Sequence, residues 1–355
     1  MKKLFALILT ILLTASLLTG CVGTTVVIGN CTCPTEQPNT PFVPAEGAVK
    51  TGLSVTTKLS DSTSATADAK GAVKYDVTLA AVLVNDEGVI VDCVIDSIPA
   101  TVEFDGKGQI TSDLAMAIPT KNELGANYGM VAWGSAKAEW DAQVAAVAKY
   151  AIGKTVDQLK NGDIDMTTGK AKDGTDLASS ATIYLAGYVY AIEAAVNNAQ
   201  HLGAQAGDSL VLATLNSVKS SASATEEKAG TIQLDADITA LTKADGKITS
   251  CYIDSLQAKV SVDATGAITT DLSAAVKTKN QLGKDYGMVA WGSAKAEWDA
   301  QAAAFAAYVT GKTAAEVAGI SINEATKPAD GTDLASSVTI SIGGFQALVA
   351  KAMQE

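Results

Sequence analysis

A segment of sixteen residues occurs twice in this chain without a single difference, and it contains all four tryptophans. Residues 128–143 and residues 286–301 both read YGMVAWGSAKAEWDAQ. The interval between the two copies is the size of a domain, which indicates a tandem duplication and excludes a solenoid of short repeats. The fold must therefore be built twice, and any function of this segment is present in two copies.

The N-terminus is typical of a secreted protein with a lipid anchor. Two lysines precede an apolar run over residues 4–18, which is too short to span a bilayer and reads as a secretory signal. The run ends in LTGC, which resembles a bacterial lipobox and implies a signal peptide over residues 1–20 and a lipidated Cys21. Because each buried methylene contributes about 0.8 kcal/mol, several acyl chains would anchor the protein stably on the extracytoplasmic face of the membrane. An ordinary signal peptide that happens to contain a cysteine is the alternative.

A proline-rich tether is expected over residues 21–47. It contains four prolines among Thr, Asn and Gly residues, a composition that keeps a chain extended. Cys31 and Cys33 form a lone C-x-C pair, with no second pair and no histidine to complete a four-ligand metal site. We expect this pair to be redox-active or incidental.

The charge and the residue usage exclude several classes of function. The net charge is −12 and no arginine occurs, which argues against a nucleic-acid partner, since that binding rests on clustered Lys and Arg. The single histidine, His201, lies between the repeats, so a Ser-His-Asp triad or a histidine-rich metal centre in each repeat is excluded. We therefore predict no catalytic residue and no metal ligand, and a binding or electron-carrier protein in preference to a hydrolase or transferase. Cys93 and Cys251 occupy equivalent positions, either as buried apolar residues or as one bridge between the repeats.

The order of expected elements is the same in both repeats and predicts an α+β fold. Strand patterns come first and helix patterns follow, a layout in which helices cover one face of a small antiparallel sheet. We expect two tandem homologous lobes, over residues 48–200 and 207–355, with the break near residues 198–208. The expected strands are 73–84, 89–95 and a short 101–104 in the first lobe, and 232–241, 248–253 and a short 259–262 in the second.

Further patterns place side chains within these elements. Alternation in the second expected strand should put four apolar side chains on one face. These are Val89, Val91, Cys93 and Ile95. Ala-rich stretches over residues 136–150 and 294–308 predict helices, with Ser135 and Ser293 as N-terminal capping residues. Closing helices are expected over residues 188–198 and 345–354.

Together these features resemble bacterial lipoproteins that carry one or two FMN-binding-like domains. The shared features are a DGKI turn with a following C-x-I-D, the YGM and Glu-Trp parts of the repeated segment, and an Asp-x-x-Ser-x-x-Thr element before the last helix. The resemblance covers nearly all of both lobes. In flavinylated members the last element reads Asp-x-x-Ser-Gly-Ala-Thr, and its threonine carries FMN through a phosphoester bond at the start of a helix. The resemblance therefore implies FMN as a cofactor.

The flavinylation element can be carried over residue by residue. The matching positions are Asp176, Ser179 and Thr182 in the first lobe, and Asp333, Ser336 and Thr339 in the second. Ser180 and Ser337 replace the glycine of the family pattern, and Val338 replaces its alanine. A Cβ at the glycine position can obstruct the approach of a phosphate to backbone amides. Two alternatives stay open for this element: Thr182 could lie in the middle of a strand, and the aspartates could form Asx-turns only.

The repeated segment supplies the other candidates for a binding site. Trp133 and Trp291, with Tyr128 and Tyr286, are either core anchors or a stacking platform for a flat ligand such as a flavin or a sugar. An acidic stretch at residues 161–165 lacks the later ligands of a calcium loop and has no counterpart in the second lobe.

Two functions are consistent with these patterns. The first is a membrane-anchored extracytoplasmic lipoprotein that binds FMN and passes electrons to a redox partner, with the cofactor carrying the chemistry. The second is a non-enzymatic surface lipoprotein that binds a partner or a small ligand without flavin.

Overall fold

The computed structural model describes residues 47–292 and 294–354. The expected signal peptide, Cys21, Cys31 and Cys33 lie outside the described residues. None of the helices in the described ranges combines the length and the apolar character that crossing a membrane requires.

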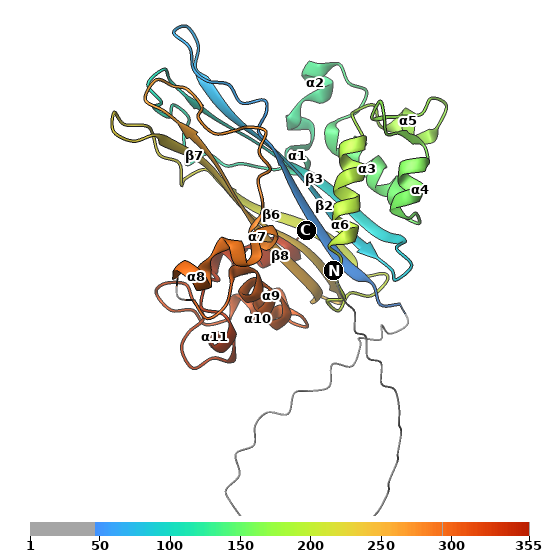
Figure 1. Cartoon of the computed structure of the whole chain (residues 1–355). Coiled ribbons are helices and arrows are strands. Elements are labelled where there is room, and N and C mark those ends of the chain that lie inside the picture. Colours follow the sequence, from blue (N-terminus) through green and yellow to red (C-terminus); the bar gives the residue numbers. More distant parts are fainter. Residues whose placement is uncertain (1–46, 293, 355) are drawn as a thin grey trace, which may run out of the picture. The chain divides into compact units, whose positions relative to one another are not determined.

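Each repeat forms one antiparallel sheet of three strands (Figure 1). The first sheet has the order β1 (Lys50–Lys58), β2 (Gly71–Val84) and β3 (Ile90–Phe104), and the second has the order β6 (Ser209–Ser217), β7 (Gly230–Ala244) and β8 (Lys247–Val262). A two-stranded hairpin, β4 (Ile164–Asp165) with β5 (Lys170–Ala171), occupies the acidic stretch that the sequence analysis considered for calcium. The α+β prediction is confirmed at this level.

Two details of the strand prediction are wrong. The separate short strands expected at residues 101–104 and 259–262 are the ends of β3 and β8, which run on without a break. Pro99 lies inside β3, which is an edge strand, where a residue without an N–H is tolerated. In addition, β1 and β6 were not expected, although each pairs with the long central strand of its sheet.

A β-bulge changes the face on which one predicted side chain lies. The register of β2 with β3 shifts between Leu83 and Val84, where Val84 pairs with Ile90 and Leu83 pairs with Asp92. An extra residue in one strand turns the following side chains to the other face. Cys93 and Ile95 therefore share the helix-covered face as expected, whereas Val91 packs against the core on the other side.

The helices follow the sheets in the same order in both repeats. In the first repeat they are α1 (Lys121–Leu124), η1 (Gly125–Tyr128), α2 (Met130–Gly134), α3 (Trp140–Ala151), α4 (Val156–Asn161), α5 (Asp176–Ser180) and α6 (Ala186–Asn197). In the second they are α7 (Lys279–Leu282), η2 (Gly283–Tyr286), α8 (Met288–Gly292), α9 (Trp298–Val309), α10 (Ala314–Ala318), α11 (Asp333–Ser337) and α12 (Gly343–Gln354).

The Ala-rich helices begin four residues later than expected, at Trp140 and Trp298. Ser135 is not an N-cap: it ends α2 in the left-handed conformation, with φ of 55°. Helix propensity alone suggested a helix from residue 136, but the left-handed residue before it separates α2 from α3. Ser293 lies outside the described residues.

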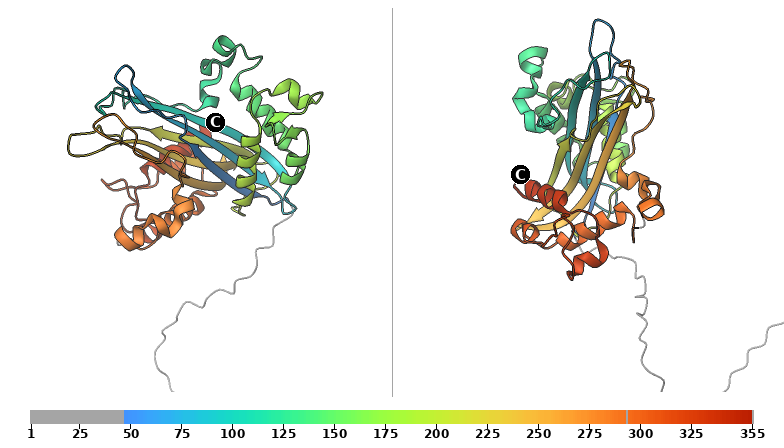
Figure 2. Two further views of the ribbon diagram at one scale, coloured as in Figure 1. Left: turned by 45° about the horizontal axis from the view of Figure 1, so that its top comes forward. Right: turned by 90° about the vertical axis from the view of Figure 1, so that its left-hand side faces the viewer.

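The two sheets face each other, and the helices of each repeat cover the outer face of its own sheet (Figures 1 and 2). One hydrophobic cluster joins the inner faces of both sheets, with Leu79, Ile98, Ile238 and Leu256 among its fully buried members. Two further clusters lie between each sheet and its own helices. Residues 198–208, where a domain boundary was expected, connect α6 to β6, and the sheets before and after this connection share one core.

Reciprocal hydrogen bonds connect loops of the two repeats. The amide of Ala65 donates to the carbonyl of Gly266 at 2.8 Å, and the amide of Ala224 donates to the carbonyl of Gly108 at 3.0 Å. Both glycines have a positive φ, and a Cβ on Gly108 would lie 2.4 Å from the carbonyl oxygen of Asp263. Only glycine therefore permits this approach. The exchange of equivalent groups gives the contact the self-complementary character of a two-fold interface within one chain.

Candidate functional site

The four tryptophans of the repeated segment divide into two buried and two exposed residues. Trp140 and Trp298 begin α3 and α9 and are 3% and 5% exposed, whereas Trp133 and Trp291 in α2 and α8 are 86% and 89% exposed. The two tryptophans of one copy lie on different helices. Core packing therefore explains Trp140 and Trp298 but not the two exposed tryptophans.

The short helix that carries Trp133 is held in place by the carboxylate of Glu139. The two oxygens of Glu139 accept from the amides of Met130, at 2.9 Å, and Val131, at 3.1 Å, and Glu297 does the same for α8. A carboxylate at a helix N-terminus satisfies free N–H groups and the helix dipole. Gly129, with φ of 82°, precedes α2, and a Cβ there would lie 3.0 Å from the Trp133 ring. The repeated segment thus presents an open indole on a capped helix.

Gln143 fixes the backbone around Thr182. Its side chain is 1% exposed, and its Oε1 accepts from the amide of Thr182 at 2.8 Å and from the Thr182 hydroxyl at 3.2 Å. Gln301 and Thr339 repeat this arrangement at 2.8 and 3.1 Å. Thr182 lies in the irregular connection between α5 and α6, so it is neither in a strand nor at a helix start.

The remaining residues of the flavinylation element have local structural roles. Asp176 and Asp333 are the first residues of α5 and α11, which are capped by the side chains of Thr175 and Thr332. The hydroxyls of two serines donate to carbonyls within the same short helices. These are Ser179, which bonds to Asp176, and Ser336, which bonds to Asp333. The helices are therefore capped by threonine in place of the Asx-turns considered from the sequence.

A buried lysine lies between two rings of the repeated segment. The Lys121 ammonium is 5.2 Å from the centre of the Tyr128 ring and 5.1 Å from that of Trp140. Lys279 lies in the same way over Tyr286, at 5.3 Å, and Trp298, at 4.9 Å. Such contacts contribute about 0.5–2 kcal/mol each. Tyr128 and Tyr286 therefore have a structural partner in addition to any ligand.

An aromatic cavity of about 550 Å³ opens beside Thr182 in the first repeat. Its walls include four aromatic side chains: Tyr128, Trp140, Tyr184 and Tyr188. The strands β1 and β2 contribute four more residues: Thr56, Lys58, Asp76 and Thr78. The indole N–H of Trp140 donates to the Tyr188 hydroxyl at 3.0 Å, and their rings meet edge to face with centres 6.0 Å apart. These contacts hold two walls of the aromatic cavity rigid.

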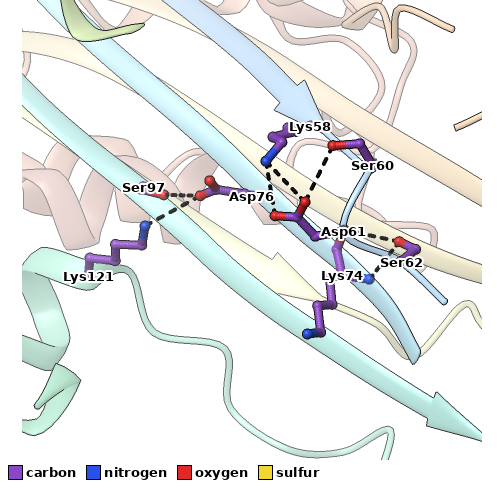
Figure 3. Close-up of polar contacts among 8 residues, drawn as sticks. All are labelled: Lys58, Ser60, Asp61, Ser62, Lys74, Asp76, Ser97 and Lys121. Carbon is purple, nitrogen blue, oxygen red and sulfur yellow. Dashed lines mark hydrogen bonds and ion pairs between the residues drawn. The ribbon is translucent and has the colours of Figure 1, made fainter. Parts of the chain in front are cut away.

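The strand residues of the cavity lining include the charged Lys58 and Asp76. Figure 3 shows the polar contacts of both residues. A carboxylate oxygen of Asp76 lies 3.4 Å from the Lys121 ammonium, and it accepts a hydrogen bond from the Ser97 hydroxyl at 3.0 Å. Lys58 pairs with Asp61 at 2.9 Å, and the side chains of both are more than half exposed. The Lys58 ammonium thus donates to both carboxylate oxygens of Asp61, and its exposed side also keeps contact with water.

The structure brings together only part of the predicted site. Tyr128 lines the aromatic cavity, and Thr182 immediately precedes Ile183 and Tyr184 of its wall. Trp133 is not part of the lining. Tyr184, Tyr188 and the four strand residues of the lining were not predicted from the sequence. A tyrosine-rich run, YLAGYVY at residues 184–190 with no counterpart in the second repeat, was the available signal.

The cysteines of the described repeats are unreactive. Cys93 and Cys251 are both free and buried, so the bridge between the repeats that the sequence left open does not form. Burial raises the pKa of each thiol to about 12, which keeps it protonated at neutral pH. Within residues 47–292 and 294–354, no group of three or more His, Cys, Asp or Glu side chains is placed to hold a metal ion.

Comparison with known proteins found no match for this chain among family models, curated proteins or solved structures.

Proposed function

We propose that this protein is an extracytoplasmic lipoprotein, anchored at Cys21 and built from two tandem homologous lobes, that binds a planar aromatic ligand. The aromatic cavity of the first repeat is the observation that carries this proposal. FMN is the ligand that the family resemblance implies. The protein would then be an electron carrier at the cell surface that passes electrons to a redox partner, and not a hydrolase or transferase.

The size and the lining of the aromatic cavity support this choice of ligand. Sites for small molecules and cofactors usually have volumes of about 300–1,000 Å³ and combine apolar walls with a few polar groups. The cavity volume of about 550 Å³ lies within this range. Aromatic walls favour a flat ring system, and Lys58 supplies a cation for a phosphate group. The residues present therefore fit a flavin mononucleotide.

The protein's own residues would bind and orient the flavin, while the bound flavin supplies the electron-transfer chemistry. The aromatic side chains would stack against the ring, with Tyr184 at the exposed rim, and Lys58 would face its charged end. Thr182 is the side chain on which a covalent phosphoester would form by analogy with the flavinylated proteins. Thr182 is an exposed residue, and its hydroxyl donates to the buried Gln143, so the proposed bond to phosphate would replace this hydrogen bond.

The test is a visible spectrum combined with the intact mass of the full-length protein, produced in a secreting host that carries a flavin transferase. We expect a yellow protein, and a mass gain of one FMN that is lost in Thr182→Ala but retained in the matched control Thr339→Ala. Yellow colour that is lost on denaturation, without a mass gain, would indicate flavin that is bound but not linked. A colourless protein at its plain mass that also fails to bind added FMN would refute the flavin proposal.

A second candidate function follows from a different observation, the exposure of Trp133 and Trp291. Exposed tryptophans on a rigid support are typical of the central anchors of binding interfaces. A surface lipoprotein that docks a partner through these two indoles would need no flavin. In that case acrylamide should quench the fluorescence of both indoles in purified protein, and this quenching should fall in the native envelope. Equal quenching in both preparations would argue against docking.

A further inference from the structure

The counterpart of the aromatic cavity in the second repeat has a different chemistry, although the backbone is the same. The pairing of β1 with β2 places Lys58 opposite Asp76, and the pairing of β6 with β7 places Ser217 opposite Asp235. The second repeat therefore has a neutral serine where the first has its exposed ammonium group.

The next pair along the same strands also differs in charge. Thr78 lies opposite Thr56 in the first sheet, and Asp237 lies opposite Leu215 in the second. At the four strand positions that line the aromatic cavity, the first repeat has one cation and one anion, whereas the second has two anions and no cation. The formal charge at these positions therefore changes from 0 to −2.

The carboxylate of Asp237 takes the strand position that Thr78 holds in the lining of the aromatic cavity. Gly187 lines the aromatic cavity in the first repeat, and its counterpart is Gly344. A carboxylate oxygen of Asp237 lies 3.2 Å from the position that a Cβ on Gly344 would take. The side chain is close to the start of α12, in the region that corresponds to the open cavity of the first repeat.

The aromatic walls differ as well. Tyr184 and Tyr188 correspond to Ser341 and Phe345 in the second repeat. Tyr184 is 60% exposed at the rim, so its ring is available to a ligand, and a serine offers no ring to stack on. Phe345 packs into the hydrophobic cluster between the second sheet and its helices. Its ring centre lies 5.8 Å from that of Trp298, edge to face, and 5.3 Å from that of Phe305, in a tilted arrangement.

We propose that the first repeat alone carries the ligand site, and that this site selects a planar ligand with an anionic group, such as the phosphate of FMN. Thr78, Lys58 and Tyr184 are the residues that determine this specificity. The second repeat keeps the fold and supplies the second half of the shared core. Lys279 balances only one of its two carboxylates, as Lys121 balances Asp76 in the first repeat, so the additional carboxylate of Asp237 repels an anion. This inference rests on the proposed function and assigns its site to one repeat.

The experiment is calorimetric titration of the full-length protein, produced without a flavin transferase, with FMN and with riboflavin, which lacks the phosphate. We expect one FMN per chain and weaker binding of riboflavin. Thr78→Asp, which introduces the residue of the second repeat, should weaken FMN binding about tenfold or more and riboflavin binding less, because the new charge acts on the phosphate.

A substitution of Tyr184, at the exposed rim of the aromatic cavity, tests the same site without introducing a charge beside α6. Tyr184→Ser should weaken the binding of both ligands about tenfold, which corresponds to about 1.4 kcal/mol. Tyr190→Ser is the matched control, since Tyr190 is a comparably exposed tyrosine in α6 outside the cavity lining. It should leave both affinities unchanged.

The outcomes separate this inference from the proposed function. Two FMN molecules per chain, or equal affinities for FMN and riboflavin, would overturn the inference and leave the flavin-binding function standing. Unchanged FMN affinity in both Thr78→Asp and Tyr184→Ser would also overturn it. Absence of binding by either ligand, together with a colourless protein at its plain mass from the host with a flavin transferase, would refute the proposed function itself.

Discussion

Three residues of the duplicated segment have structural roles that explain their presence in both copies. Glu139 caps α2, Trp140 is buried between the sheet and its helices, and Gln143 binds the connection that contains Thr182. Each role is fulfilled in the same way in the second repeat. Trp133 has no comparable burial, which is why its exposure calls for a functional explanation.

Asp254 is the buried carboxyl with the clearest consequence for stability. Burial raises its pKa from the ordinary carboxyl value to about 6, against the opposing hydrogen bonds from Thr278, Asn280 and Ser255. The folded state therefore binds the proton more tightly than the unfolded chain. The stabilisation is fully present below pH 4 and is lost as the pH rises through 6, and a shift of about two units corresponds to about 3 kcal/mol.

Asp254→Asn removes this titration while an amide oxygen continues to accept hydrogen bonds. We expect the variant to unfold at higher urea concentration than the wild type at pH 7, and the two to converge at pH 4. Urea unfolding at pH 4, 5, 6 and 7 measures this difference. Asp68→Asn, at an exposed position, is the control and should follow the wild type. A difference between Asp254→Asn and the wild type that does not depend on pH would contradict the assignment.

At the scale of elements, α2 and α8 are too short to be stable on their own. Each has five residues, and a helix of this length is unstable in water without tertiary support. The support comes from Glu139 and Glu297, which lie outside the helices they cap, at the start of α3 and α9. The position of the exposed indoles thus depends on one carboxylate in each repeat.

Glu139→Ala should release α2 without unfolding the repeat. The amides of Met130 and Val131 lose their acceptors, so we expect faster hydrogen exchange there and a fall in the free energy of unfolding of only about 1 kcal/mol. Exchange measured by mass spectrometry on peptides across residues 128–136 checks this. Lys137→Ala, an exposed position in the same loop, should show wild-type exchange. Unchanged protection of the two amides in Glu139→Ala would refute the capping role.

At the scale of the whole molecule, the two repeats are joined by the core between their sheets. Tyr75 is buried in that core, and its hydroxyl donates to the carbonyl of Ile232 in the other repeat at 2.8 Å. A separated repeat would expose the apolar inner face of its sheet to water. The burial of this apolar surface therefore stabilises both repeats, and each sheet would lose stability without the other.

We expect the repeats to unfold in a single transition. Trp140 and Trp298 each report on one repeat, so Trp298→Phe and Trp140→Phe leave one buried reporter in each variant. When Tyr75→Phe is added to both, the two fluorescence curves should shift together by about 1 kcal/mol, because the lost hydrogen bond joins the repeats. Tyr190→Phe, an exposed substitution, should shift neither curve. A shift of only one curve would show that the repeats unfold independently.

Several parts of the fold could be predicted from the sequence because they depend on local pattern. Alternation and turn residues predicted β2, β3, β7 and β8, and alanine content predicted α3 and α9, four residues too long at the start. The strands β1 and β6 were missed. The bulge at Val84 could not be predicted, since it depends on the pairing between two strands.

The candidate site was predicted only in part, for a related reason. Tyr128 and Thr182 were selected by motif, and they do lie at or beside the aromatic cavity. Its other walls come from strands and a helix far apart in sequence, so no local pattern connects Lys58 or Asp76 with Tyr188. Trp133 and Trp140 look equivalent in sequence, yet one is exposed and the other buried, because packing decides which side of each helix meets the sheet.

The sequence by itself determined the duplication, the α+β class, the acidic charge and the absence of arginine, since these depend on residue identity and short-range periodicity. Only the tertiary structure decided that the two sheets share one core and that an aromatic cavity opens in the first repeat. The physical reason is that burial and charge at a site are set by residues brought together from distant segments. Identical segments therefore acquire different surroundings, with Lys58 and Thr78 in one repeat and Ser217 and Asp237 in the other.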